Sequence, residues 1–237
     1  MKNKEEKTYS TFYIVGTPIG NLEDMTFRAV RILKEVDLIL CEDVSNAQKI
    51  LRHFDIDTKC TNYFANSRLS KIDDIVDMLK EGKNVALISD AGMPTISDPG
   101  SLLIEKIYQA KKDDLAIDIK VIPGPTAITS SFALSGLTGN EFTFLGFLPH
   151  KKGRETLFKE IADNKRVSIF YESVHRFEKC LESLEKVLEE DRMIVVAREL
   201  TKIHEEVVRG NIGEVKEYFE QNKDKVRGEF VILVDGK

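Results

Sequence analysis

Continuous apolar runs alternate with amphipathic segments along the first half of the chain. The runs are short and rich in β-branched residues, which is typical of strands buried on both faces of a parallel sheet. The intervening segments place apolar residues three and four positions apart, which predicts helices that cover that sheet. The predicted strands are residues 11–15, 38–41, 85–89 and 117–122, and the predicted helices are residues 26–36, 47–54, 69–80 and 101–111.

The pattern changes at Pro123-Gly124-Pro125, after which the last strands follow one another with shorter connections. Short connections favour antiparallel neighbours, so the second half is expected to form a mixed sheet. We therefore predict an N-terminal α/β domain over residues 1–123 and a C-terminal mixed α/β domain over residues 124–237. In the second half the predicted strands are residues 142–148, 167–171, 193–197, 206–209 and 230–234, and the predicted helices are residues 126–134, 154–162, 177–188 and 212–219.

The composition is that of an ordinary soluble globular protein and mainly excludes alternatives. Of the 237 residues, 42% are hydrophobic and 32% are charged, and the net charge is −5. Neither half is basic, so the bulk charge does not indicate a nucleic-acid partner, and a DNA-binding domain is not expected. Cys41, Cys60 and Cys180 form no metal-binding motif, so free thiols and no metal are expected. The absence of a signal-peptide pattern and of a long apolar run predicts a cytoplasmic protein without a membrane segment.

Polar loops follow several of the predicted strands, which is where open α/β sheets bind their ligands. The loop of residues 89–100, SDAGMPTISDPG, contains two prolines and two glycines that restrict its path. Its Asp98-Pro99 pair is typical of a helix N-cap followed by proline, so we interpret Asp98 as a cap. Asp90 at the strand tip lacks such a role, and its carboxylate is a candidate acceptor for a ribose hydroxyl or an amine.

The loop after the first strand, residues 16–22, contains neither GxGxxG nor GxxxxGK. Both standard phosphate-binding loops are absent from the sequence, which disfavours NAD and ATP as ligands. A third loop, residues 123–126, is either an interdomain turn or part of a pocket. A fourth polar group, residues 172–176, combines a carboxylate, a hydroxyl, an imidazole and a guanidinium at one strand end.

One dense basic stretch, residues 150–154, lies in a predicted loop. It is either the solvent-exposed start of the following helix or a contact with the phosphate backbone of a nucleic acid. The candidate phosphate contacts are Lys151, Lys152, Arg154, Lys165 and Arg166, with Arg176 as a further contributor.

Seven motifs in order carry a resemblance to the tetrapyrrole methylase superfamily, the class III S-adenosylmethionine-dependent methyltransferases. The resemblance covers residues 12–236, and within the superfamily the chain resembles members that methylate the ribose 2′-OH of a cytidine in 16S rRNA. No single motif is decisive, but their order is highly specific. The motifs are GTPIGNL (16–22), SDAGMPTISDPG (89–100), PGPTA (123–127), GFLPHKKGR (146–154), FYESVHR (170–176), ARELTKIHEE (197–206) and RGEFVILV (227–234).

The resemblance implies two α/β domains, a deep cleft between them that binds S-adenosylmethionine, and a homodimer. It also implies a substrate in the small ribosomal subunit, with 16S rRNA as the acceptor. Pro18 and Gly20 would shape the acceptor side, and Thr126 and Ala127 would close the hinge. The implied cofactor-binding residues are Pro18, Asp90, Ala91, Gly92, Pro94, Ile96, Thr126, Ala127, Tyr171, Arg198, Glu229 and Phe230.

Two segments depart from the family pattern, and both lie on the acceptor side. Where the family has Glu-Asp-Thr-Arg, this chain has Glu42-Asp43-Val44-Ser45, and YFANS at residues 63–67 replaces a His-rich tract. The cofactor half of the resemblance is therefore better supported than the RNA half. Three functions stay open: methylation of rRNA, methylation of a tetrapyrrole or protein side chain, and S-adenosylmethionine binding without catalysis.

Methyl transfer to a ribose hydroxyl requires that the oxygen be aligned with the methyl carbon and that its proton be removed. Glu42, Asp43 and Glu172 are the candidate bases, and His175 and Arg176 are the candidates for orienting the acceptor. Because both halves are acidic, RNA contacts are expected only at local basic patches. A folded ribosomal target is favoured over free RNA for the same reason.

Overall fold

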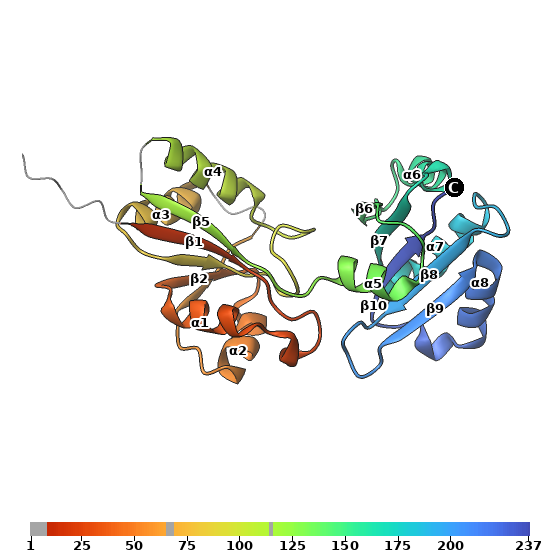
Figure 1. The fold of residues 1–237 in the computed structure, drawn as a ribbon, viewed down its shortest axis with the longest axis horizontal. Helices are drawn as coiled ribbons and strands as arrows, with labels where there is room; N and C mark the ends of the chain where they lie inside the picture. Colours follow the sequence, from red (N-terminus) through yellow and green to blue (C-terminus); the bar gives the residue numbers. More distant parts are fainter. Residues whose placement is uncertain (1–8, 65–68, 114–115) are drawn as a thin grey trace, which may run out of the picture. The chain divides into compact units, whose positions relative to one another are not determined.

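The computed structural model describes residues 9–64, 69–113 and 116–237, and the chain forms two compact units, Met1–Pro125 and Thr126–Lys237 (Figure 1). The predicted fold class is confirmed, with a parallel sheet in the first unit and a mixed sheet in the second. Within the described residues, no helix is long and apolar enough to cross a membrane. Residues 65–67 of the predicted family departure lie outside the described residues.

The first unit is built on a parallel sheet with strand order β3-β2-β4-β1-β5. Successive side chains of a strand point to opposite faces, so each strand contributes to two cores. Leu38 and Leu40 lie in one core, whereas Ile39 and Cys41 lie in the other. The strands are β1 (Ser10–Val15), β2 (Leu38–Cys41), β3 (Cys60–Asn62), β4 (Val85–Leu87) and β5 (Ile117–Ile122).

Two helices cover each face of this sheet. Helices α1 (Phe27–Glu35) and α2 (Val44–His53) pack on one face, and α3 (Leu69–Lys80) and α4 (Ser101–Lys112) pack on the other (Figure 1). A short 3-10 helix, η1 (Leu22–Asp24), precedes α1. The layers place the loops that follow β2 and β4 at one edge of the sheet, because neighbouring parallel strands end at the same edge.

The second unit is built on a mixed sheet with strand order β6-β7-β10-β8-β9. β6 and β7 are parallel, and the remaining neighbours are antiparallel, as the short connections predicted. The strands are β6 (Phe142–Phe147), β7 (Val167–Ser173), β8 (Met193–Arg198), β9 (Glu206–Asn211) and β10 (Glu229–Val234). The helices are α5 (Ala127–Ser135), α6 (Arg154–Asp163), α7 (Val174–Glu185), α8 (Ile212–Gln221) and the 3-10 helix η2 (Lys223–Lys225).

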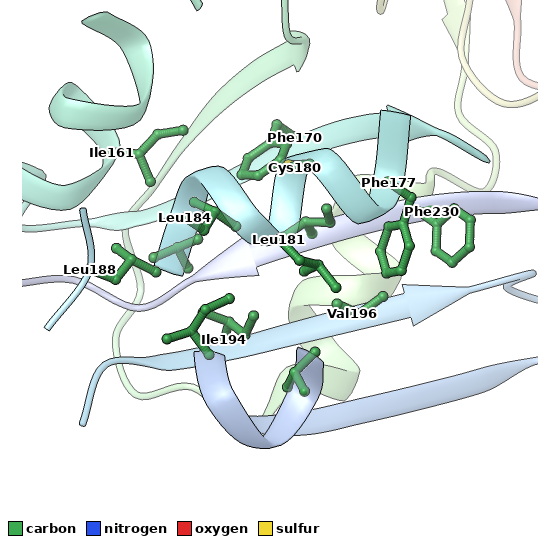
Figure 2. Close-up of a cluster of buried hydrophobic side chains, with 14 of the residues drawn as sticks. Ile161, Phe170, Phe177, Cys180, Leu181, Leu184, Leu188, Ile194, Val196 and Phe230 are labelled. Atoms are coloured by element: carbon green, nitrogen blue, oxygen red, sulfur yellow. The ribbon is translucent and has the colours of Figure 1, made fainter. Parts of the chain in front are cut away.

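Helices α6, α7 and α8 share one core with one face of this sheet (Figure 2). Phe177 of α7 stacks on Phe230 of β10 with ring centroids 4.0 Å apart, and Phe219 of α8 meets Phe177 edge-on. The opposite face carries α5, which contacts β8, β9 and β10. No described residue of α5 belongs to the core of the other three helices. At the β6 edge, the ring of Phe132 of α5 lies 5.2 Å from that of Phe142, centroid to centroid.

The structure differs from the sequence prediction at several places. β3 was not predicted, because its three residues, Cys-Thr-Asn, are too few and too polar to give a pattern. α2 and α7 each begin three residues earlier than predicted, since the first turn of each holds a single valine among polar residues and shows no apolar spacing. The prediction that Asp98 caps a helix was wrong. The N-cap of α4 is Gly100, which makes no side-chain capping bond.

Candidate active site

Three carboxylates meet at the carboxyl edge of the first sheet. Glu42 directly follows β2, Asp90 follows the neighbouring β4, and Asp98 lies in the same loop as Asp90. Burial raises the pKa of Glu42 to about 7, and the negative charges of Asp98 and Asp90 add to the shift. Oε1 of Glu42 is buried and has no hydrogen-bond partner among the described residues. Glu42 is thus a carboxyl group that exchanges its proton near neutral pH.

Asp98 takes part in this cluster instead of capping α4. Burial raises its pKa to about 6, against the opposing effect of a hydrogen bond with Ser89. The Asp90 charge raises the pKa of Asp98 as well. At pH 7 Asp98 is therefore mostly ionised, and its charge favours protonated Glu42. Sequence reasoning missed this role because Asp-Pro before a helix is the usual sign of a cap.

Asp90 connects the tip of β4 to the start of α2. Its carboxylate accepts hydrogen bonds from the backbone N–H of Asp43 at 3.3 Å and from Nδ2 of Asn46 at 3.0 Å. Asp43 itself caps α2, because its Oδ1 accepts the backbone N–H groups of Ser45 and Asn46. The predicted base Asp43 therefore has a structural task. Sequence reasoning missed Asn46, since nothing local in the sequence indicates its contact with Asp90.

The loop after β1 is fixed to the loop after β4. Thr17 and Gly92 exchange backbone hydrogen bonds of 2.9 and 3.1 Å. The buried Thr17 hydroxyl also donates to the carbonyl oxygens of Ser89, at 3.1 Å, and Gly92, at 3.3 Å. These bonds hold the backbone on both sides of the predicted cofactor segment in one geometry. Of the residues predicted there, Ala91 and Ile96 are exposed, whereas Pro18, Gly92 and Pro94 are buried.

Two glycines allow the first unit's loops to cross closely. A Cβ placed on Gly16 would lie 2.7 Å from Cα and N of Gly124 and 2.7 Å from Sδ of Met93. A backbone neighbour cannot move aside as a flexible side chain can. The close approach of the two loops thus requires glycine at positions 16 and 124.

Replacing Gly16 by alanine is expected to destabilise the first unit by about 1–3 kcal/mol, the usual cost of forcing an extra carbon into a packed site. Urea denaturation followed by hydrogen exchange of residues 10–15 and 117–122 measures this loss. An unfolding free energy within about 0.3 kcal/mol of the wild type would show that the crossing has room for a methyl group.

In the second unit, Glu172 forms a buried ion triad with two arginines. Its carboxylate is fully buried and lies 2.7 Å from Nη2 of Arg154 and 2.8 Å from Nη2 of Arg176. The backbone N–H of Ser173 donates to the same carboxylate at 2.8 Å. The two guanidinium groups also donate to backbone carbonyls, Arg154 to Pro149 and Arg176 to Leu148. This arrangement fixes the loop after β6 to β7 and α7.

The triad brings together three residues for which we predicted different roles. Glu172 was a candidate base, Arg176 a candidate for orienting the acceptor, and Arg154 a candidate RNA contact. A carboxylate held by two arginines and a backbone N–H is fully satisfied, and both guanidinium groups are engaged. The geometry supports a structural role for all three. His175, between them in the sequence, is exposed.

The other predicted cofactor residues of the second unit lie in varied surroundings. Thr126 caps α5, and its hydroxyl lies 2.7 Å from that of Thr129. Arg198 is buried and pairs with Glu206 at 3.3 Å, while the exposed Glu229 pairs with Lys202. The Phe230 side chain belongs to the core. Ala127 begins α5, and Tyr171 is half-buried on β7.

The basic residues divide into paired and unpaired groups. Arg166 pairs with Glu141, and Arg154 belongs to the triad. Within the described parts of the chain, Lys151, Lys152 and Lys165 form no ion pair, and the first two are exposed in the loop between β6 and α6. In the same parts, no group of three or more His, Cys, Asp or Glu side chains is arranged to hold a metal ion.

Comparison with known proteins places these features in a family. The model for tetrapyrrole (corrin/porphyrin) methylases matches residues 11–216. The chain is 43% identical over 226 residues to the ribosomal RNA small subunit methyltransferase I of Thermotoga maritima, covering 94% of this chain and 97% of that protein. It is 42% identical over 234 residues to the protein of the same name from Streptococcus pyogenes serotype M3, covering 98% and 79%.

A solved structure also shares the fold. The methyltransferase CobJ superposes with a TM-score of 0.68 at 20% sequence identity, covering 96% of this chain and 94% of that one. The similarity supports the two-sheet architecture described above.

Proposed function

This chain belongs to the tetrapyrrole methylase family of S-adenosylmethionine-dependent methyltransferases, and from that premise we propose that it methylates the ribose 2′-OH of a cytidine in 16S rRNA. The similarity to small-subunit rRNA methyltransferases over nearly the whole chain is the observation that carries the proposal. The same similarity supports rRNA over a tetrapyrrole or a protein as the acceptor. The enzyme is proposed to act in the cytoplasm as a homodimer.

The acidic edge of the first sheet fits the cofactor. S-adenosylmethionine carries a cationic sulfonium and an amine, and when bound it supplies a methyl group already activated for transfer. The carboxylates of Asp90 and Asp98, beside Glu42, provide a negative environment for a cationic ligand. Asp90, which is exposed, is proposed to accept a hydrogen bond from a ribose hydroxyl or an amine of the cofactor. The backbone of the loop held by Thr17 is proposed to contact the remainder of the cofactor.

The proposed first-unit contacts are Pro18, Asp90, Ala91, Gly92, Pro94 and Ile96. From the second unit, we propose contacts from Thr126, Ala127, Tyr171, Arg198, Glu229 and Phe230, the last through its backbone because its ring is in the core.

Among the candidate bases, the local geometry favours Glu42. Asp43 caps α2, and Glu172 is neutralised by two arginines. Glu42 has a pKa of about 7 and a carboxyl oxygen without a partner among the described residues. A base works best when its pKa lies near the working pH, because it is then both deprotonated and able to accept a proton. We therefore assign removal of the 2′-OH proton to Glu42.

The loop lysines are proposed to hold the RNA backbone. Replacing Lys151 and Lys152 together by alanine is expected to raise the KM for small ribosomal subunits, without changing the affinity for S-adenosylmethionine. Each lost phosphate contact lowers the slope of log affinity against log salt by about one, so the double variant should lower it by about two.

The matched control replaces Lys111 and Lys112, two adjacent lysines at the end of α4. An equal KM for the two double variants would show that the 151–152 loop does not contact the subunit.

The proposed activity is tested with purified protein, S-adenosylmethionine carrying a labelled methyl group, and small subunits isolated from cells that lack this gene. The expected product is labelled 2′-O-methylcytidine in 16S rRNA. Label in protein alone, or binding of S-adenosylmethionine without transfer to the subunit, would overturn the proposal.

A further inference from the structure

The edge strand β6 carries a row of aromatic side chains on the face of the second sheet opposite α6, α7 and α8. Phe142 and Phe144 pair in register with Val167 and Ile169 of β7, and none of these four belongs to the core of the three helices. Leu145, one residue further along, packs against that core instead. The alternation of a strand therefore puts Phe142 and Phe144 on the other face.

A bulge in β6 brings a third ring onto the same face. The register shifts between Phe144 and Phe147, and Gly146 between them has a φ of 63°, the left-handed conformation that glycine adopts without strain. Strict alternation would turn Phe147 toward the helices. With the extra residue, Phe147 pairs with Tyr171 instead. Bulges at sheet edges commonly re-aim a side chain in this way.

The rings line one face of the sheet, and we call Phe142, Phe144, Phe147 and Tyr171 the aromatic strip. The Phe142 ring at its end lies 5.2 Å from that of Phe132 of α5, centroid to centroid. The Tyr171 ring lies 5.1 Å from that of Phe144 and 5.2 Å from that of Phe147, centroid to centroid. Phe147 is 55% exposed and Phe142 is 37% exposed. β6 is the last strand of its sheet, and no strand of the described residues pairs with its outer edge (Figure 1).

Basic residues stand at both ends of the strip. Lys151 and Lys152 follow β6 after Phe147, and Lys165 and Arg166 precede β7 beside Phe142, which pairs with Val167. Of these four, only Arg166 forms an ion pair within the described residues, with Glu141. Exposed aromatic rings between positive charges are the combination by which proteins hold single-stranded nucleic acid, since every base has a face that stacks.

We propose that the aromatic strip binds unpaired nucleotides of the RNA substrate by stacking, with the flanking lysines on the phosphates. The inference rests on the proposed rRNA acceptor and specifies which surface receives it. It also explains how an acidic protein holds RNA: a local platform replaces a basic face. A second copy of the chain fits the strip less well, because both ends are basic and any pairing of two strips brings lysines together.

The test compares three substitutions at Phe147 with one exposed apolar residue elsewhere in the unit. Phe147→Ala removes the ring, Phe147→Leu keeps an apolar side chain without a ring, and Phe147→Tyr keeps the ring. Ile203→Ala, at a residue 98% exposed in the loop between β8 and β9, is the control. Fluorescence anisotropy with a labelled 12-nucleotide single-stranded RNA at fixed salt gives the affinity. Calorimetry with S-adenosylmethionine and light scattering report the cofactor site and the oligomeric state.

Stacking predicts about tenfold weaker RNA binding for the alanine and leucine variants. The tyrosine and Ile203 variants should bind RNA as the wild type does, with particle mass unchanged throughout. Tyr171 is also a proposed cofactor contact and packs on Phe147, so calorimetry separates a change at the cofactor site from a loss of stacking. Wild-type affinity in the leucine variant, an equal loss in the Ile203 variant, a changed particle mass, or no RNA binding by the wild type would each overturn the inference. Failure of the proposed function has a separate signature, namely no methyl transfer from the wild type to small subunits.

Discussion

Replacing Glu42 by glutamine is expected to lower kcat for methyl transfer about 100-fold or more, since a positioned base contributes about 10²–10⁴ in rate. Glutamine keeps the size of the side chain and cannot accept the proton. The wild-type rate should rise with pH through about 7, as Glu42 ionises. The variant's residual rate should lack this step. Single-turnover methyl transfer between pH 5.5 and 8.5 measures both effects, with Glu105→Gln on the exposed side of α4 as the control.

The stability of the same variant separates loss of a base from loss of the fold. The pKa of Glu42 is raised in the folded protein, so the folded protein binds this proton more tightly than the unfolded chain does. The resulting stabilisation is complete below about pH 4.5 and is lost as pH rises through about 7. Glu42→Gln should therefore be at least as stable as the wild type at pH 8. A variant that keeps its activity and its pH profile would remove Glu42 from the mechanism.

Replacing Glu172 by glutamine is expected to destabilise the second unit by about 3–5 kcal/mol, because two partly buried arginines lose the buried carboxylate that pairs with them. The loss should be largest around β7, α7 and the loop after β6, which the triad joins. Hydrogen exchange of residues 148–185 in a urea series follows that region directly.

Glu178→Gln provides the matched comparison for the triad. Glu178 lies on the same helix, α7, and its pair with Lys223 is about half exposed. Such surface pairs contribute about 0–1 kcal/mol, so this variant should be nearly as stable as the wild type. Equal stability of the two variants would contradict a structural triad. Loss of methyl transfer in Glu172→Gln without loss of stability would return Glu172 to the candidate bases.

The elements of this fold could be predicted because the relevant information is local. The apolar residues of α3, spaced three and four apart, predicted its exact bounds, and the continuous apolar run of β2 predicted that strand. β3 escaped because three polar residues acquire strand structure only by pairing with β2. The bulge at Gly146 is likewise set by pairing with β7, and a sequence of aromatic residues around a glycine does not reveal it.

The candidate site was harder to predict because its chemistry depends on contacts between distant segments. Motif reasoning named Glu42, Asp43 and Glu172 as equivalent carboxylates, yet Glu42 has a pKa of about 7, Asp43 caps a helix and Glu172 pairs with two arginines. For Asp98 the local rule itself failed: an Asp-Pro pair before a helix predicts a cap, but the N-cap of α4 is Gly100. Arg154 and Lys152 are close neighbours in the sequence, but of the two only Arg154 forms an ion pair with a buried carboxylate within the described residues.

The central claim, that this methyltransferase modifies a 16S rRNA ribose, is tested most directly by mass mapping of ribosomal RNA from cells with and without the gene. The account predicts one 2′-O-methylcytidine in 16S rRNA that disappears with the gene and returns with the wild-type chain, but not with Glu42→Gln. An rRNA map that is identical with and without the gene would contradict it.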